Sequence, residues 1–141
     1  MPRAINQIFA LTSSKFDQAI TIRCSYAEIY NEQIRDLLSA QGGSTNNNLQ
    51  ISDDQRGGCV VRGLSQHVCD TEEEALNCLF EGELDRTTGY TALNSVSSRA
   101  HTIFTMYIES RSRVESADKV TYSKLHLVDL AGCERTKKSE S

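Results

Sequence analysis

The strongest constraint on the fold of this chain is the stretch 102–110, Thr-Ile-Phe-Thr-Met-Tyr-Ile-Glu-Ser. It is rich in β-branched and aromatic residues, which strands favour, and it carries apolar side chains on both of its faces. A strand of this kind has to be covered on both sides, as the inner strands of layered α/β sheets are. We therefore predict that residues 102–110 form an inner strand of a central sheet.

Other strands are indicated by the side-chain patterns on either side of this stretch. Residues 19–27 alternate between apolar and polar, which predicts a strand with one buried face. Residues 49–52 and 59–62 flank a segment rich in aspartate and glycine, so they are predicted to form a hairpin. Residues 122–130 predict a last strand, which follows a charged turn at 111–118.

Helices are marked by the residues that suit their first turns. Pro2 is tolerated there because its missing N–H costs nothing, and residues 2–11 are predicted to be helical. Thr71 and Glu74 match the capping box that begins many helices. The apolar residues at helical spacing behind it are Ala75, Leu76, Leu79, Phe80 and Leu84. Residues 31–38 are also predicted to form a short helix, with Ile34, Leu37 and Leu38 on its apolar side.

The mixture of strands and helices predicts an α/β fold, in which the polar segments 39–48 and 85–100 are surface loops. Ligands of open α/β sheets bind outside the carboxyl ends of the strands. The candidate motifs described below lie at loop positions of that kind.

Composition narrows the class of protein. Hydrophobic residues make up 38% of the 141 and charged residues 24%, which is typical of a globular domain. No apolar run approaches the roughly 18 to 20 residues that cross a bilayer, so no membrane partner is expected. Met1-Pro2-Arg3 is not followed by the apolar region of a secretory signal, which leaves the cytosol as the expected compartment.

Charge and cysteine usage exclude further classes. The formal net charge is −4, whereas proteins that bind polyanions usually carry a basic face, so nucleic acid is not an expected partner. The cysteines are odd in number and contain no Cys-x-x-Cys pair, which argues against a disulfide framework or a zinc site. They are Cys24, Cys59, Cys69, Cys78 and Cys133, and most are expected to be buried apolar residues in a reducing compartment.

The first motif that carries chemistry is Leu127-Val128-Asp129-Leu130-Ala131-Gly132. An apolar strand delivers Asp129 at its end, where an aspartate can hold Mg²⁺ directly or through water in a phosphate-cleaving site. Gly132 would let a backbone N–H approach a phosphate without a side chain in the way. The same spacing is also typical of an ordinary turn at the end of a strand, and the motif alone does not separate the two interpretations.

The second motif is Asn94-Ser95-Val96-Ser97-Ser98-Arg99-Ala100-His101. Adjacent hydroxyls and an arginine on a loop suit phosphate or metal ligation. Taken alone, however, this segment is better explained by a serine-rich turn in solvent, with Arg99 as a surface charge.

Considered together, the two motifs are far more specific. Asn-x-x-Ser-Ser-Arg-x-His, followed by Leu-Val-Asp-Leu-Ala-Gly-x-Glu-Arg, resembles switch I and switch II of the kinesin motor domain. The resemblance extends over nearly the whole chain, in the order of the family. It includes Pro2-Arg3-x-x-x-x-Ile8-Phe9, Ser25-Tyr26-x-Glu28-Ile29-Tyr30-Asn31-Glu32 and Asp36-Leu37-Leu38. Myosins have a related pair of switches, but Asp129-Leu130-Ala131-Gly132-Cys133-Glu134 is closer to the kinesin pattern.

The resemblance implies the fold of a nucleotide-hydrolysing motor core, with a central mixed, mostly parallel sheet flanked by helices. It implies ATP and Mg²⁺ as cofactors. Ser97 and Ser98 would meet the γ-phosphate and the metal ion, Asn94 would support the loop, and Asp129 would hold the Mg²⁺ shell through water. Two positions depart from the family pattern, because Ala100 and Cys133 stand where serine is usual.

The catalytic roles implied by the resemblance belong to Gly132, Arg99 and Glu134. The Gly132 N–H would sense the γ-phosphate. Arg99 and Glu134 would form the salt bridge that closes the two switches, and Glu134 would help to order the attacking water. The motor assignment therefore predicts that the segment 97–99 and the segment 129–134 converge on one pocket.

Microtubules are the partner that the resemblance implies, with Arg62, Lys137 and Lys138 as contact candidates, although solvated surface charges explain these three equally well. The resemblance also allows a dimer formed through regions absent from the sequence. The stretches Ala19–Arg23, Leu79–Glu83 and Ile103–Tyr107 resemble the flagella-associated kinesin subfamily, which suggests an axonemal setting in addition to the cytoplasmic cytoskeleton.

The sequence contains no Gly-x-x-x-x-Gly-Lys-Ser/Thr, and it stops within the loop after switch II. Residues 1–141 are accordingly interpreted as a partial motor domain, without the upstream phosphate-binding loop and without the downstream microtubule-binding helix and neck. The isolated chain is expected to fold poorly and not to hydrolyse ATP. A kinesin-like protein that binds microtubules or partners without turnover is the alternative, and a stand-alone α/β interaction domain with accidental motif matches is a third interpretation.

Overall fold

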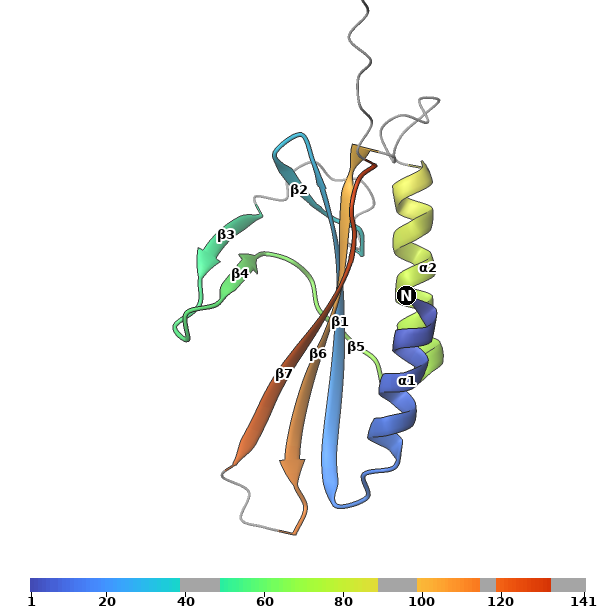
Figure 1. The fold of residues 1–141 in the computed structure, drawn as a ribbon, viewed down its shortest axis with the longest axis vertical. Coiled ribbons are helices and arrows are strands. Elements are labelled where there is room, and N and C mark those ends of the chain that lie inside the picture. The colour runs from blue at the N-terminus through green and yellow to red at the C-terminus, as the bar shows by residue number, and fades with distance from the viewer. Residues whose placement is uncertain (39–48, 89–98, 115–118, 133–141) are drawn as a thin grey trace, which may run out of the picture.

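A computed structural model describes residues 1–38, 49–88, 99–114 and 119–132 of the chain. The elements follow one another as α1 (Pro2–Ser13), β1 (Gln18–Tyr30), β2 (Gln33–Asp36), β3 (Gln50–Asp53), β4 (Cys59–Arg62), β5 (His67–Val68), α2 (Glu72–Thr88), β6 (His101–Ser112) and β7 (Val120–Asp129). Both helices cover the same side of the main sheet, and the β3–β4 hairpin extends on the other side (Figure 1). Within the described ranges, neither helix combines the length and the apolar character that a bilayer span requires.

The main sheet has the strand order β2-β1-β6-β7, and β5 pairs with β1 beside β2. Every pairing between described strands is antiparallel, so the expected mostly parallel sheet is not confirmed in this part of the chain. A tight turn explains this arrangement for β1 and β2, because neighbouring strands that are joined in this way have to run in opposite directions. Asn31 and Glu32 form that turn.

β6 is the inner strand that its apolar character predicted. It pairs with β1 from His101 to Ser112 on one edge and with β7 on the other. Phe104 and Met106 are fully buried, and the Phe104 ring meets the Tyr26 ring edge-on, with the two centroids 5.4 Å apart. The buried core also contains Ile5, Ile22, Cys24, Leu37, Leu38, Cys69, Ala75 and Leu79.

β1 is more completely buried than its sequence predicted. Alternation predicted one buried face, formed by the apolar residues, and Ile22, Cys24 and Tyr26 are indeed buried. Ser25 and Ala27, which alternate to the other face of the strand, are buried as well, and the Ser25 hydroxyl donates a hydrogen bond to the Tyr107 hydroxyl at 3.2 Å. The prediction of a single buried face was therefore wrong for this part of the strand.

Both predicted capping signals are confirmed. Pro2 occupies the first turn of α1. At the start of α2, the Thr71 hydroxyl accepts a hydrogen bond from the Glu74 N–H at 3.2 Å, and the Glu74 carboxylate accepts one from the Asp70 N–H at 2.7 Å. α2 continues to Thr88, so the loop predicted to begin at residue 85 starts later than expected.

The short helix predicted at 31–38 was wrong. Asn31 and Glu32, at φ 51° and 61°, form a tight turn after β1, and the chain returns along it as β2. Positive φ at both loop positions is the geometry of turns that match the twist of a two-stranded ribbon. Strand pairing with β1 therefore outweighed the helical spacing of Ile34, Leu37 and Leu38.

The hairpin predicted around the aspartate- and glycine-rich segment is confirmed, with β3 and β4 paired from Gln50↔Arg62 to Asp53↔Cys59. The turn contains Gly57 at φ +81°, a conformation that other residues rarely adopt. The loop predicted at 39–48 and most of the one predicted at 85–100 lie outside the described residues.

Candidate functional site

The beginning of β6 and the end of β7 lie at the same end of the main sheet (Figure 1). Thr102 pairs with Asp129 in the last registered pair of the two strands. Arg99 lies two residues before the start of β6, and Gly132 is the last residue of the exit segment of β7, residues 130–132. The first motif and the described end of the second, residues 99–101, are thereby brought to one edge of the sheet.

A side-chain hydrogen bond extends this connection beyond the paired residues. The His101 Nδ1 accepts a hydrogen bond from the Ala131 N–H at 2.9 Å. Ala131 lies between Asp129 and Gly132, so the first residue of β6 contacts the backbone of the predicted phosphate-sensing segment. The sequence analysis named His101 only as the last residue of the second motif, and no signal in the sequence could have identified its partner.

Asp129, Gly132 and Arg99 are all exposed at this edge. Carboxylate oxygens are ligands that Mg²⁺ accepts in proteins, directly or through its water shell, so Asp129 fits the metal ion that the resemblance implies. Among the described residues, no three His, Cys, Asp or Glu side chains form a group that could hold a metal ion by themselves. The remaining predicted members of this site, Asn94, Ser97, Ser98 and Glu134, lie outside the described residues, and so does the predicted Arg99–Glu134 contact.

A buried charged cluster stands behind this edge, and sequence reasoning had assigned it no role. Glu28 on β1 is only 1% exposed and lies 3.6 Å from Arg35 on β2 and 3.6 Å from Arg86 on α2, measured between nitrogen and oxygen. Arg35 also contacts Asp85, through its carboxylate at 3.3 Å and its carbonyl at 3.0 Å. A buried carboxylate requires such partners because its desolvation is costly. The cluster joins the last turns of α2 to β1 and β2.

The same turns of α2 are held close to the sheet by Tyr26. Its hydroxyl donates a hydrogen bond to the Glu83 carboxylate, and burial together with that carboxylate raises the pKa of Tyr26 well above its ordinary value. Gly82 lies directly on the ring, since a Cβ at this position would come within 2.0 Å of a Tyr26 ring carbon. A glycine is therefore required for the helix to approach the strand this closely.

The cysteines follow the sequence prediction in part. Cys24 and Cys69 are buried, Cys78 is half-buried and Cys59 is exposed, and all four are free thiols. The Sγ atoms of Cys69 and Cys78 lie 3.8 Å apart. Contact with the Cys24 thiol, together with burial, raises the pKa of Cys69 to about 12. The pKa of Cys78 is also raised, by the Cys69 thiol and by burial, so neither thiol is activated for chemistry.

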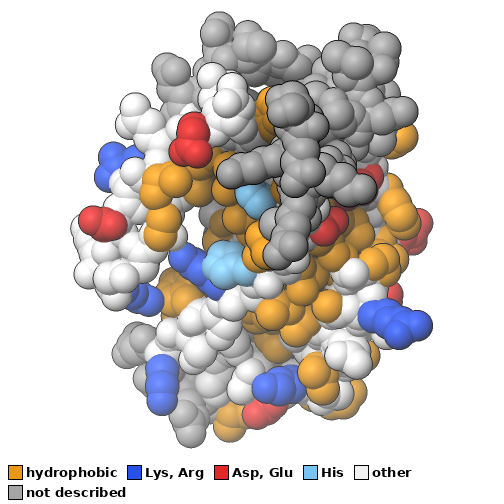
Figure 2. Space-filling model, turned by 45° about the horizontal axis from the view of Figure 1, so that its top comes forward, with side chains coloured by type: hydrophobic (Ala, Val, Ile, Leu, Met, Phe, Trp, Pro, Cys, Tyr) orange, Lys and Arg blue, Asp and Glu red, His pale blue; other side chains and the backbone are white. Residues whose placement is uncertain are grey.

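Of the three predicted microtubule contacts, Arg62 is the one whose surroundings are described. Arg62 is exposed at the end of β4, and its Nε donates to the Ser52 hydroxyl on β3 at 3.0 Å. Lys137 and Lys138 lie outside the described residues. Figure 2 shows charged side chains of both signs scattered around a central hydrophobic area, rather than a continuous patch of one sign.

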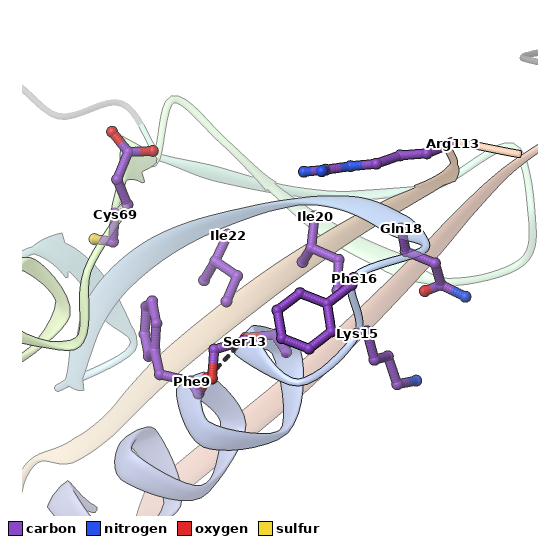
Figure 3. Close-up of a pocket in the computed structure, with 11 residues that line it drawn as sticks. Phe9, Ser13, Lys15, Phe16, Gln18, Ile20, Ile22, Cys69 and Arg113 are labelled. Carbon is purple, nitrogen blue, oxygen red and sulfur yellow. Dashed lines mark hydrogen bonds between the residues drawn. The ribbon is translucent and has the colours of Figure 1, made fainter.

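A cavity of about 270 Å³ lies at the opposite end of the sheet, between the end of α1 and the beginning of β1 (Figure 3). Phe9, Phe16, Ile20 and Cys69 contribute to its wall, and Arg113 reaches it from beyond β6. None of the predicted site residues lines it. The predicted site residues in the described part of the chain therefore lie away from this cavity, at the edge of the sheet that carries Asp129.

Comparisons with known proteins agree with the motifs. The family model described as the kinesin motor domain matches residues 1–141. The chain is 44% identical over 143 residues to "Kinesin-like protein KIF9" of Homo sapiens, covering 100% of this chain and 18% of that protein. It is 44% identical over 139 residues to "Kinesin-like protein KLP1" of Chlamydomonas reinhardtii, covering 99% of this chain and 18% of that protein.

A solved structure shows the same fold. It is described as "Structure of a fast kinesin: Implications for ATPase mechanism and interactions with microtubules", and the match has a TM-score of 0.83 at 36% sequence identity. The match covers 100% of this chain and 38% of that one. The chain thus spans less than a fifth of the two curated relatives and well under half of the solved one.

Proposed function

Because the chain belongs to the kinesin motor domain family, we propose that it is part of an ATP-hydrolysing microtubule motor. In this proposal, the edge of the sheet that carries Arg99 and Asp129 is part of the nucleotide site. The observation that carries the proposal is the pairing of Thr102 with Asp129, which sets the start of β6 beside the end of β7. Two motifs that are separate in the sequence thereby share one edge.

Each residue of the site has a role that its chemistry supports. Asp129 would hold the water shell of Mg²⁺, and Ser98 would bind the metal ion through its hydroxyl. Ser97 would contact the γ-phosphate, Asn94 would support the loop, and the Gly132 N–H would bind the phosphate. Mg²⁺, when bound with ATP, supplies the positive charge that neutralises the phosphate oxygens.

Arg99 and Glu134 close the site by forming a salt bridge across it, and Glu134 orders the attacking water. Phosphoryl transfer depends on positioning and charge stabilisation more than on covalent chemistry, so polar and charged side chains of this kind are sufficient. Closure excludes bulk water and strengthens each interaction. Loss of the phosphate after hydrolysis then releases the two segments, and this release can change the structure of the surface that binds the filament.

The filament is the microtubule, with Arg62, Lys137 and Lys138 as contact residues, and the protein works on the cytoplasmic cytoskeleton, with the axoneme as a specific setting. Arg62 is suited to this role by its exposure on the hairpin that extends from the sheet. Residues 1–141 form part of a motor domain whose remaining elements include a phosphate-binding loop, a main microtubule-binding helix and a neck.

The proposal is tested by the ATPase rate of the intact protein that contains this chain, measured with and without microtubules. Asp129→Asn keeps the shape of the side chain and removes its charge, and we expect kcat/KM for ATP to fall roughly 10- to 100-fold. Asp17→Asn is the matched control, because Asp17 is exposed at the opposite end of the sheet. Unchanged turnover in Asp129→Asn contradicts the proposed site.

The alternative, a kinesin-like protein that binds without turnover, is favoured by one observation. Ala100, which replaces a serine usual in the family, is 1% exposed, so the hydroxyl is missing from a buried position beside the proposed site. If the intact protein binds ATP and microtubules but releases no phosphate, and Ala100→Ser restores turnover, the alternative is the correct one.

A further inference from the structure

The hydrogen bond between His101 and Ala131 has a position that strand pairing alone does not explain. The ladder between β6 and β7 ends at the pair Thr102↔Asp129, and the chain then leaves β7. The His101 imidazole reaches past this last pair and accepts the N–H of Ala131, at 2.9 Å. A side chain thus continues the connection between the two strands after their backbones have stopped pairing.

The exit segment of β7 has little else to fix its direction among the described residues. Asp129, Leu130 and Gly132 are exposed, Leu130 to 70% of its surface. Exposed segments with few buried contacts open at a low free-energy cost. A single hydrogen bond to a residue anchored in an inner strand therefore has a large influence on where this segment lies.

We propose that His101 is a positioning residue for the candidate nucleotide site. Its Nδ1 holds the backbone at Ala131 and thereby sets the placement of the Asp129 carboxylate before it and of the Gly132 N–H after it. The inference rests on the proposed function, because it assigns His101 to that site. His101 itself does not touch the reacting atoms in this role.

The geometry also states which form of the imidazole is required. Nδ1 can accept the Ala131 N–H only through its lone pair, so this hydrogen bond requires the form of the ring in which Nδ1 carries no proton. What the site needs from His101 is therefore a hydrogen-bond acceptor at one point, not a charge. An asparagine can place its amide oxygen near that point, whereas an alanine cannot.

His126 supplies a matched control on the neighbouring strand. It is also an exposed histidine, and its Nδ1 lies 2.8 Å from the hydroxyl of Thr105. Thr105 and His126 are, however, a registered pair inside the ladder. Loss of that hydrogen bond leaves the strands paired on both sides of it and does not free the exit segment of β7.

The experiment compares His101→Ala, His101→Asn and His126→Ala with the intact wild-type protein. For each variant, kcat and KM for MgATP and the hydrogen-exchange rate of the Ala131 amide are measured. The net contribution of an intramolecular hydrogen bond corresponds to a change of roughly 2- to 12-fold in an equilibrium constant. We expect His101→Ala to raise KM and the exchange rate by about this factor, with a smaller change in kcat. His101→Asn is expected to restore most of both, and His126→Ala to change neither.

Two results would overturn the inference. In one, the Ala131 amide exchanges at the wild-type rate in His101→Ala. In the other, His101→Asn is as impaired as His101→Ala, so that the acceptor is not what the site needs. If instead the wild-type protein neither binds nor hydrolyses ATP, the proposed function fails, whereas the exchange rate of Ala131 still reports on the hydrogen bond.

Discussion

β1 and β7 are long strands of the same sheet, yet they have opposite surroundings. β1 has neighbours on both edges and α2 across one face, and its residues from Cys24 to Glu28 are all buried. β7 pairs only with β6 among the described strands, and none of its ten residues is buried. The strand that holds the core together is thus not the strand that delivers the candidate chemistry.

In this part of the molecule, the residues that stabilise the fold are different from those that carry the candidate chemistry. Buried aromatic contacts and paired charges around β1 resist opening, because each is desolvated and closely packed. The end of β7 is exposed, and segments that bind ligands and move are drawn from such weakly buried regions. A substitution at β1 should therefore alter the stability of the protein, and one at β7 should alter it little.

The largest expected effect compares a tyrosine on each strand. Tyr26→Ala removes a fully buried ring that packs on Phe104, and we expect the free energy of unfolding to fall by roughly 3–5 kcal/mol. Tyr122→Ala, on β7, removes a ring that is 57% exposed, and a loss below about 1 kcal/mol is expected. Urea denaturation of the two variants measures both values, and equal losses would break the comparison.

The next largest loss of stability is expected where α2 lies close to β1. Gly82→Ala inserts a Cβ where the Tyr26 ring lies, and overpacking of this kind costs roughly 1–3 kcal/mol. Gly58→Ala is the control, since a Cβ there would meet only Asp54 atoms at 3.8 Å. The midpoints of urea unfolding should separate the two variants, and a Gly82→Ala protein as stable as the wild type would show that α2 can move off β1.

Two ion pairs, one around buried Glu28 and one at exposed Arg111, test the same comparison between buried and exposed positions. Glu28→Gln removes the charge between Arg35 and Arg86, and a loss of about 1–3 kcal/mol is expected because two partly buried guanidinium groups lose their shared partner. Glu109→Gln breaks the contact with Arg111, at 3.0 Å, and the exposure of Arg111 limits the loss to roughly 1 kcal/mol or less. Thermal unfolding of both variants at low and high salt tests this, with salt dependence expected only for the Glu109 pair.

The smallest expected effect is a pH dependence of stability that begins only above pH 9. The folded protein raises the pKa of Cys69 from its ordinary value of 9.0 to about 12 and so favours the neutral thiol. The contribution of this thiol is therefore full below pH 9 and is lost as the pH rises from 9 toward 12. The stability difference between the wild type and Cys69→Ala should be constant from pH 6 to 8 and shrink above pH 9. A difference that grows with pH would contradict the assigned pKa direction.

Local patterns in the sequence predicted several elements because the interactions that define them span only a few residues. The capping box of Thr71 and Glu74 acts within one helical turn, and the hairpin of β3 and β4 depends on the turn between them. The inner strand β6 was recognisable because burial on both faces leaves apolar side chains on both faces. Arg99 and Asp129 were proposed as site residues from motifs whose chemistry is local.

Pairing between distant segments was beyond such reasoning. Residues 31–38 carry helical spacing, but the turn at Asn31 and Glu32 and the free edge of β1 made a strand of them. The partners of Glu28 come from β2 and α2, and no local pattern connects them. His101 could not be assigned because its partner is a backbone N–H, which every residue but proline possesses.

The sequence by itself determined the two helices with capping signals, the inner strand β6 and the β3–β4 hairpin, together with which residues suit phosphate and metal chemistry and which family the chain resembles. Only the tertiary structure decided that Gly82 packs against the Tyr26 ring, that Glu28 forms ion pairs with two arginines, and that His101 accepts a hydrogen bond from the Ala131 N–H. The physical reason is that propensity, capping and turn formation act over a few residues, whereas packing and hydrogen bonding across a sheet depend on how the whole chain is arranged.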